Sequence, residues 1–281
     1  MYEAFYGLRE KPFTILPDPE LIYWGSMHRM AFTMLEFGVT NNAGFTVITG
    51  AIGSGKTTLL RYLLKKLSSN VTMGLISNSP QGRHELLQWI LMSFSQPFEG
   101  DYPTLFKRLQ DFLYRQHASR RRTILIIDEA QNLGSDSLEH LRMLSNINVD
   151  KHQILQLIIV GQPELRDLLL SPQLHQLAQR ISSDFHLQPL NESEVANYIL
   201  FRLKAAGATR VMFTLDAAAR IAEASGGVPR MINILCDTAL VYGFANGHQT
   251  ITADLVADVI ADKQQYSILP LQKPSKIAKY L

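Results

Sequence analysis

The sequence is poor in cysteine and in charged residues. Cys236 is the single cysteine among 281 residues, which excludes an internal disulfide and a cysteine-rich zinc site and fits a reducing compartment. Charged side chains make up 19% of the chain and apolar ones 46%. The charged fraction is a little below the usual ~25% for globular domains. Composition therefore predicts a folded globular protein and argues against disordered, collagen-like and coiled-coil classes.

An excess of one charge and a long apolar run are also missing. Lys+Arg 27 against Asp+Glu 25 gives a formal net charge of +2, which is too balanced for a chain whose main partner is bulk nucleic acid. The N-terminus carries no apolar stretch followed by a cleavage site. The purest apolar runs, 124–127 and 157–160, are far shorter than the ~20 residues of a membrane-spanning helix. We expect a soluble, cytoplasmic chain without a transmembrane segment.

What is present is an alternation of strand-like and helix-like patterns up to about residue 190. The strand-like runs lie at 44–50, 71–77, 123–127, 155–160 and 184–187. Helical patterns fill 27–40, 57–67, 83–117 and the segment around Leu138 to Leu144. The run 123–127 consists of β-branched residues and leucine, which is typical of a strand covered on both faces. The alternation predicts βαβ units and an α/β fold with a doubly wound parallel sheet.

After Pro189 the pattern changes to amphipathic helices separated by glycine-containing breaks. We expect Cys236 to be a small core residue of one of these helices. The predicted organisation has four parts. They are an aromatic, proline-punctuated lead-in at 1–30, an α/β domain at 31–190, a small all-helical domain at 191–263, and a flexible basic tail at 264–281.

Residues 50–57 match the phosphate-loop pattern G-x-x-x-x-G-K-[ST] in full, between a predicted strand and a predicted helix. Its glycines let backbone N–H groups approach a polyphosphate, and the helix that follows adds the positive end of its dipole. Lys56 would reach the β- and γ-phosphates, Thr57 would bind Mg²⁺, and Thr58 would contact the α-phosphate side. The predicted nucleotide-binding residues of this segment are Gly50, Ala51, Ile52, Gly53, Ser54, Gly55, Lys56, Thr57 and Thr58.

The apolar strand 123–127 leads directly into Asp128 and Glu129. Asp128 is expected to help hold Mg²⁺, and Glu129 to polarise the water that attacks the γ-phosphate. The alternative is that Asp128 caps the next element and Glu129 is a surface residue. The pair favours hydrolysis over nucleotide sensing. It also argues against a small-molecule kinase, because the sequence reveals no pocket for a second substrate.

Polar residues further along fit the same chemistry. Gln162 follows a predicted strand and is a candidate for positioning the attacking water, the alternative being a turn residue. Arg180 precedes the last strand and is a candidate arginine finger for a neighbouring subunit, or a surface residue. Arg230 follows Gly-Gly-Val-Pro at a helix start, and its guanidinium would couple nucleotide state to the angle of the helical domain. A surface role is its alternative as well.

These motifs, in this order, resemble an AAA+ ATPase. Phrases such as Asp128-Glu129-Ala130-Gln131-Asn132-Leu133 and Gly161-Gln162-Pro163-Glu164-Leu165 resemble, more narrowly, the general secretion pathway protein A (ExeA-like) family and its short relatives in exopolysaccharide and exosortase systems. The resemblance covers about residues 1–262. It implies a P-loop sheet domain followed by a helical lid. It assigns Lys56 and Thr57 to phosphate and Mg²⁺, Asp128 to Mg²⁺, Glu129 to catalysis, Gln162 and Arg230 to the two sensor positions, and Arg180 to the finger.

The same resemblance places the lead-in on the adenine and ribose side of the nucleotide, with Phe13, Pro17, Tyr23 and His28 in contact. It implies a Mg²⁺-dependent ATPase that forms a ring or filament and acts as a motor or switch on protein partners of a secretion, envelope or polysaccharide-export system. Any approach to the inner membrane would be made through partners. Longer members continue into a membrane span and a peptidoglycan-binding region, which we do not expect in this chain up to Leu281.

Two alternatives for the biological role stay open at the level of sequence. A DNA-dependent regulator, similar to the transposition ATPases, would use the basic cluster 117–122 and the lysines of the tail. We favour a solvated loop for that cluster and protein partners for the chain, so that nucleic acid is the second choice. A nucleotide-gated scaffold that does not hydrolyse ATP is the other alternative. The eight histidines show no ligand spacing, so Mg²⁺ is the expected metal.

Overall fold

The computed structural model describes residues 1–266 except 42, 68–69, 79, 81 and 150–151. These residues form two compact units. The sheet unit contains 29–50 and 59–187, and the helical unit contains 1–28, 51–58 and the chain from Gln188 onward. The four-part division expected from the sequence remains a prediction, and most of its basic tail, 267–281, lies outside the described residues.

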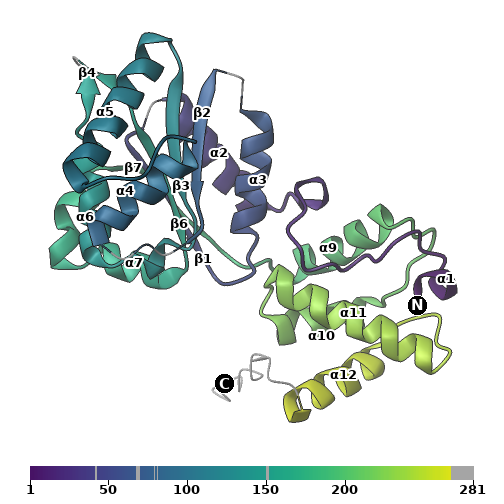
Figure 1. Cartoon of the computed structure of the whole chain (residues 1–281). Coiled ribbons are helices and arrows are strands. Elements are labelled where there is room, and N and C mark those ends of the chain that lie inside the picture. Colours follow the sequence, from purple (N-terminus) through teal and green to yellow (C-terminus); the bar gives the residue numbers. More distant parts are fainter. Residues whose placement is uncertain (42, 68–69, 79, 81, 150–151, 267–281) are drawn as a thin grey trace. The chain divides into compact units, whose positions relative to one another are not determined.

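The sheet unit is built on a parallel five-stranded sheet in the order β2-β3-β6-β1-β7 (Figure 1). Its strands are β1 (Phe45–Gly50), β2 (Val71–Ile76), β3 (Arg122–Ile127), β6 (Gln156–Gly161) and β7 (Ile181–Leu187). Every strand lies within a few residues of a run expected from the sequence, and the α/β prediction with a doubly wound parallel sheet is confirmed.

The central strands are buried on both faces. Leu125 and Ile127 of β3 join the large core of this unit together with Leu157 and Ile159 of β6. The alternate residues, Ile124 and Ile126 among them, are also fully buried. Because successive side chains of a strand point to opposite faces, continuous apolar runs are what a sheet with helices on both sides requires.

Helices precede and connect the strands of this sheet (Figure 1). They are α2 (Ser26–Thr40), α3 (Lys56–Lys66), α4 (Gly82–Ser93), α5 (Tyr102–Ala118), α6 (Ser135–Leu144), α7 (Pro163–Leu169) and α8 (His175–Ala178), with short 3₁₀ turns η2 (Ala130–Asn132) and η3 (Pro172–Leu174). The range 83–117 is divided between α4 and α5, and Asp101 caps α5 by accepting from the Thr104 N–H at 3.0 Å. The short hairpin β4 (Asn148–Val149) and β5 (His152–Gln153) was not expected.

The helical unit contains α9 (Glu192–Ala205), α10 (Leu215–Ser225), α11 (Pro229–Ala245) and α12 (Ala253–Tyr266), as well as α1 (Glu3–Tyr6) and the turn η1 (Pro19–Leu21). Asn191 and Glu194 form a capping box at the start of α9. Gly226, with φ +58°, ends α10, and Pro229 opens α11. Cys236 is fully buried in the core of this unit, as expected.

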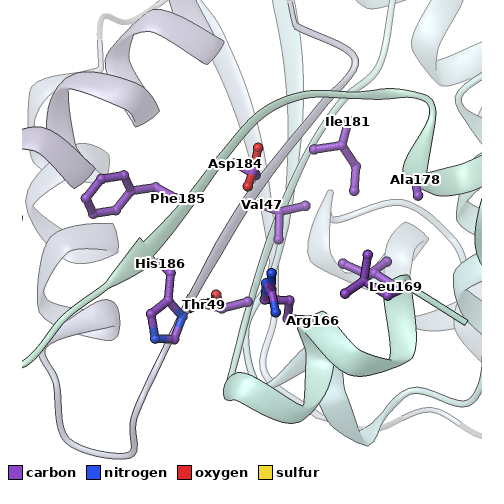
Figure 2. Close-up of a pocket in the computed structure, with 10 residues that line it drawn as sticks. Val47, Thr49, Arg166, Leu169, Ala178, Ile181, Asp184, Phe185 and His186 are labelled. Carbon is purple, nitrogen blue, oxygen red and sulfur yellow. Dashed lines mark hydrogen bonds between the residues drawn. The ribbon is translucent and has the colours of Figure 1, made fainter.

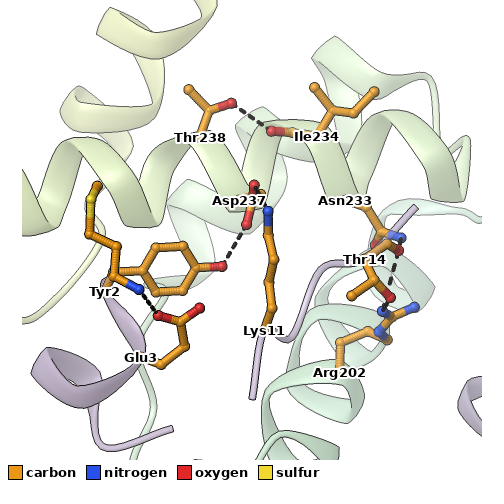
Figure 3. Close-up of polar contacts among 10 residues, drawn as sticks. Tyr2, Glu3, Lys11, Thr14, Arg202, Asn233, Ile234, Asp237 and Thr238 are labelled. Carbon is orange, nitrogen blue, oxygen red and sulfur yellow. Dashed lines mark hydrogen bonds and ion pairs between the residues drawn. The ribbon is translucent and has the colours of Figure 1, made fainter. Parts of the chain in front are cut away.

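The N-terminal segment is part of that core. Tyr2, Tyr6 and Phe13 are at most 3% exposed and pack among residues of α9, α10 and α11. Figure 3 shows polar contacts of this segment: Arg202 Nη2 donates to the Thr14 hydroxyl at 3.1 Å, and Lys11 pairs with Asp237 at 2.8 Å. The buried Arg202 Nε also donates to the Pro12 carbonyl at 2.8 Å. Segments from opposite ends of the sequence therefore build one core, and Phe13, which was expected beside the nucleotide, is a core residue.

Candidate functional site

The phosphate loop joins β1 to α3, and its glycines are required by its conformation. Gly53 has φ +79° and Gly55 has φ +101°, values that favour glycine. A Cβ on Gly53 would lie 2.4 Å from the Cβ of Arg230, and one on Gly55 would lie 3.1 Å from Nε2 of His28. Replacement of Gly53 would therefore push the Arg230 backbone away as well as strain the loop.

Two side chains around the loop contact its carbonyl groups. The Lys56 Nζ donates to the Ala51 carbonyl at 3.0 Å, and Lys56 is 5% exposed. His28 Nε2–H donates to the Ser54 carbonyl at 2.9 Å, and burial lowers the pKa of this imidazole, so it is neutral near pH 7. The buried Ser54 hydroxyl has no hydrogen-bond partner among the described residues. Lys56 and the Ser54 hydroxyl are thus groups of the loop that could bind an anion.

Arg230 contacts the loop, whereas Tyr23 packs elsewhere in the same unit. The backbone N–H of Arg230, in the first turn of α11, donates to the Gly53 carbonyl at 3.2 Å, and its side chain is exposed. The Tyr23 ring lies edge-on to Tyr198 of α9, with centroids 5.7 Å apart. Thr57 and Thr58 occupy the first turn of α3, and Ile52 is 59% exposed at the loop.

In the sheet unit, Asp128 and Glu129 stand at the carboxyl end of β3. Asp128 is 6% exposed, its N–H donates to the Ile76 carbonyl at 2.8 Å, and its Oδ1 accepts from the Glu129 N–H at 3.0 Å. Glu129 has φ +54°, a left-handed conformation that costs a non-glycine residue about 1–2 kcal/mol. Strain of this kind persists where the surroundings hold the residue in place, and it is common at functional sites.

The Glu129 carboxylate is held by two amides. Gln162 Nε2 donates to Glu129 Oε2 at 3.0 Å, and Gln131 Nε2 donates to the same oxygen at 2.7 Å. Gln131 Oε1 in turn accepts from the backbone N–H of Gln162 at 3.0 Å. The structure therefore brings Gln162 to Glu129, next to Asp128. No role was predicted for Gln131. Its position two residues after Glu129 is the signal that could have pointed to it.

Arg180 lies between α8 and β7 and is half-buried. Its Nη1 donates to the buried Ser145 hydroxyl at 3.1 Å. An arginine that reaches into a neighbouring subunit would have to give up this contact.

A cavity of about 260 Å³ lies beside Arg180, between β1, the edge strand β7, and α7 and α8 (Figure 2). Ala178 and Ile181, which flank Arg180 in sequence, line it together with Thr49, Asp184 and His186. The Thr49 hydroxyl and His186 Nδ1 are hydrogen-bonded at 2.8 Å. The sequence did not indicate this cavity, because its walls come from segments more than a hundred residues apart.

The residues expected to hold the metal supply oxygen donors. Magnesium prefers one or two carboxylates, phosphate oxygens and water, and the Thr57 hydroxyl and Asp128 carboxylate have that chemistry. Among the described residues no group of three histidine, cysteine, aspartate or glutamate side chains gathers into a separate metal site. In the same part of the chain no helix combines the length and the apolar character needed to cross a bilayer.

Comparisons with known proteins show what the chain is similar to. A family model described as an AAA domain matches residues 39–169. General secretion pathway protein A of Aeromonas hydrophila is 39% identical over 258 residues, which are 91% of this chain and 47% of that protein. The chain thus spans about half the length of this relative.

Solved structures share the fold at low identity. ORC2 of Aeropyrum pernix, solved as ADPNP–ADP complexes, has a TM-score of 0.59 at 18% identity, covering 84% of this chain and 66% of its own. Cdc6p of Pyrobaculum aerophilum gives 0.64 at 18% identity, covering 82% and 65%. The RuvB branch migration motor of Thermotoga maritima gives 0.53 at 20% identity, covering 88% and 73%. Residues 39–169 therefore carry a domain of the AAA family, and the chain is related to general secretion pathway protein A.

Proposed function

We propose that the chain binds ATP with Mg²⁺ and hydrolyses it, and that Glu129 is the catalytic base. The observation that carries this proposal is the position of the Glu129 carboxylate, fixed by the Gln131 and Gln162 amides directly after Asp128 at the carboxyl end of β3. In parallel α/β sheets ligands bind at this edge, and β1 of the same sheet leads into the phosphate loop.

The phosphate loop would bind the triphosphate. Lys56 would exchange the Ala51 carbonyl for β- and γ-phosphate oxygens, and loop N–H groups and the start of α3 would face the anion. Thr57 and Asp128 would hold Mg²⁺, which neutralises charge on the phosphates when bound. Tyr23 and His28 remain candidates for the adenine and ribose side. His28 touches the loop at Ser54, which supports its assignment more than that of Tyr23.

Hydrolysis requires a water aligned with the γ-phosphate. The Glu129 carboxylate would accept a proton from that water, and Gln162 is placed to orient both the carboxylate and the water. Gln131 is a positioning residue, since it contacts Glu129 and the Gln162 backbone and would act through them.

Arg230 and Arg180 are assigned to control of the reaction. The Arg230 backbone N–H is hydrogen-bonded to the Gly53 carbonyl, so a shift of the phosphate loop on nucleotide binding would move the start of α11. Arg180 would act on a neighbouring subunit in a ring or filament after leaving Ser145. The cavity beside it on the edge of the sheet supports a docking role for this region.

The biological role proposed is a motor or switch acting on protein partners of a secretion, envelope or polysaccharide-export system. The relationship to general secretion pathway protein A and the near-neutral charge support it. The alternative, a DNA-dependent ATPase regulator, rests on the basic cluster 117–122. Turnover measured with and without duplex DNA at two salt concentrations separates the two, because strong stimulation that disappears when Arg120, Arg121 and Arg122 are changed to alanine would favour the alternative.

The chemical proposal is tested with Glu129→Gln in the full chain. This variant should bind ATP as the wild type does and lose turnover by about 10²–10⁴-fold, the usual contribution of a general base. Lys56→Ala should lose binding as well, which provides the matched comparison. Wild-type protein without turnover at any concentration would refute hydrolysis and favour the nucleotide-gated scaffold.

The finger assignment is tested by mixing. Arg180→Ala should bind ATP without turning it over, and so should Glu129→Gln. Mixed oligomers contain some sites with both an intact Glu129 and a neighbour's intact Arg180, so activity should return on mixing. No recovery at any ratio would contradict action between subunits.

A further inference from the structure

A cavity of about 450 Å³ opens at the amino ends of β3 and β6, in the sheet unit. The end of α5, the beginning of β3 and the segment from β5 to β6 form its walls. Because β3 is six residues long, this cavity lies about 20 Å from Asp128, which follows the carboxyl end of the same strand. It is therefore separate from the acidic part of the proposed ATPase site.

The walls of this cavity are basic. Arg120, Arg121 and Arg122 line it in succession, with His117 and His152, whose ring centroids lie 6.2 Å apart. None of the described residues on its walls is acidic. Arg122 also donates to the Val39 carbonyl at 2.8 Å, which fixes the beginning of β3 beneath the two more exposed arginines. Such a set of cations attracts an anion.

Two of the residues that line the cavity carry a buried polar atom without a hydrogen-bond partner in the described part of the chain. The Thr123 hydroxyl oxygen and the Gln156 Oε1 belong to side chains that are 1% and 4% exposed, and neither atom finds a hydrogen-bond partner among the described residues. Both residues line the cavity. Buried polar groups are nearly always satisfied in folded proteins. Because Gln156 pairs with Ile124, its side chain shares a face of the sheet with Arg122 and not with Thr123. A ligand that offers a hydrogen-bond donor beside its charge would therefore satisfy Gln156 Oε1.

The loop that presents the arginines is strained. Arg120 has φ +55°, a conformation favoured by glycine, and its N–H donates to the His117 carbonyl at 2.9 Å to end α5. A glycine would suit this backbone position better. A binding role for the Arg120 side chain would explain why an arginine occupies this position.

We propose that this cavity binds a small phosphorylated molecule that also carries hydroxyl or amino groups, of the size of a sugar phosphate or mononucleotide. The arginines would hold the phosphate, and Gln156 Oε1 would accept a hydrogen bond from a hydroxyl or amino group. The volume lies in the range of small-molecule sites, about 300–1,000 Å³. Duplex DNA fits less well, because a hollow admits only a short part of its backbone and this cluster is too small for a footprint.

The experiment uses the full chain with Lys56→Ala, which removes phosphate binding at the loop. Inorganic pyrophosphate, glucose 1-phosphate, AMP and a duplex of about 20 base pairs, enough for roughly two turns, are titrated separately by calorimetry. We expect saturable binding with one site for at least one of the small probes. Arg121→Ala should weaken that binding at least tenfold, whereas Arg115→Ala, a change of equal charge on α5 outside the cavity, should not.

Binding by none of the small probes would overturn the proposal, as would equal weakening by Arg115→Ala or binding by the duplex alone. Arg120→Gly provides a second variant that relieves backbone strain, so a loss of affinity in it cannot be assigned to misfolding. Gln156→Leu should weaken glucose 1-phosphate more than pyrophosphate, because only the former offers hydroxyl donors to Gln156 Oε1. None of these outcomes bears on ATP turnover, so this proposal and the proposed ATPase function fail separately.

Discussion

The two ends of β3 are alike in backbone and opposite in chemistry. Arg120, before the strand, and Glu129, after it, both adopt the left-handed conformation that favours glycine, and Ser95 is the only other described non-glycine residue that does so. At the carboxyl end the charge is negative and two amides satisfy it. At the amino end the charge is positive, and two buried polar atoms lack partners among the described residues.

The two ends of β3 therefore differ in whether their polar groups already have partners within the chain. The carboxyl end is already organised around Glu129, and under the proposed function it would act once a nucleotide and a metal are bound. The amino end leaves its polar groups unfilled, which suits a site completed by its ligand. A parallel sheet places ligands at its carboxyl edge by topology, so a site at the amino edge depends on local residues such as Arg121 and Gln156.

Removal of Mg²⁺ should produce the largest difference between the activities assigned to the two ends of β3. With excess EDTA, ATP turnover should fall to background, because the metal neutralises charge on the phosphates. Pyrophosphate binding by the Lys56→Ala chain should persist, since its cations are arginines. The measurement is turnover and calorimetry in the same buffer. Loss of pyrophosphate binding in EDTA would show that the amino end also depends on a metal.

Glutamines at both ends of β6 provide the next comparison. Gln162→Ala should reduce kcat by about 100-fold and Gln131→Ala by about 10-fold, since misplacement of a catalytic group by about 1 Å can cost 100-fold. Gln156→Ala, at the other end of the same strand, should leave kcat within about twofold. Steady-state turnover per folded molecule, with folding checked by circular dichroism, decides this. Equal losses in all three variants would indicate a structural effect.

The smallest expected effects are on stability. Arg120→Gly and Ser95→Gly should each stabilise the chain by about 0.5–1 kcal/mol, because glycine removes the left-handed penalty but adds entropy to the unfolded state. Glu129→Gly should gain nothing, since it also loses two hydrogen bonds worth about 0.5–1.5 kcal/mol each. Urea midpoints at unchanged m-value provide the measurement. Stabilisation by Glu129→Gly equal to that by Ser95→Gly would mean that the amides contribute little.

The parts of the fold that could be predicted were those set by contiguous sequence. The run 124–127 is apolar throughout, and the glycines of the phosphate loop stand at fixed spacing, so both were visible in the sequence. The hairpin β4–β5 was missed because strands of two residues carry no alternation.

Residues of the candidate site could be predicted where they belong to a sequence motif. Contacts that depend on which strands lie side by side could not. Asp128, Glu129 and Gln162 were expected because each follows a strand. The contact of Gln131 with Gln162 depends on the placement of β3 beside β6. The basic cluster was expected to be a solvated loop, since the sequence does not show that the register Ile124↔Gln156 brings the segment after β5 against it.

The interleaving of the N-terminal segment with α9 and α11 has a consequence for how the chain is made. Residues 29–187 can collapse on the sheet as they leave the ribosome, because their core is complete without the ends. Tyr2, Tyr6 and Phe13 are synthesised before the sheet unit, yet their partners in α10 and α11 are synthesised after it. This aromatic segment must wait through most of translation, and during that interval it is exposed to chaperones and to aggregation.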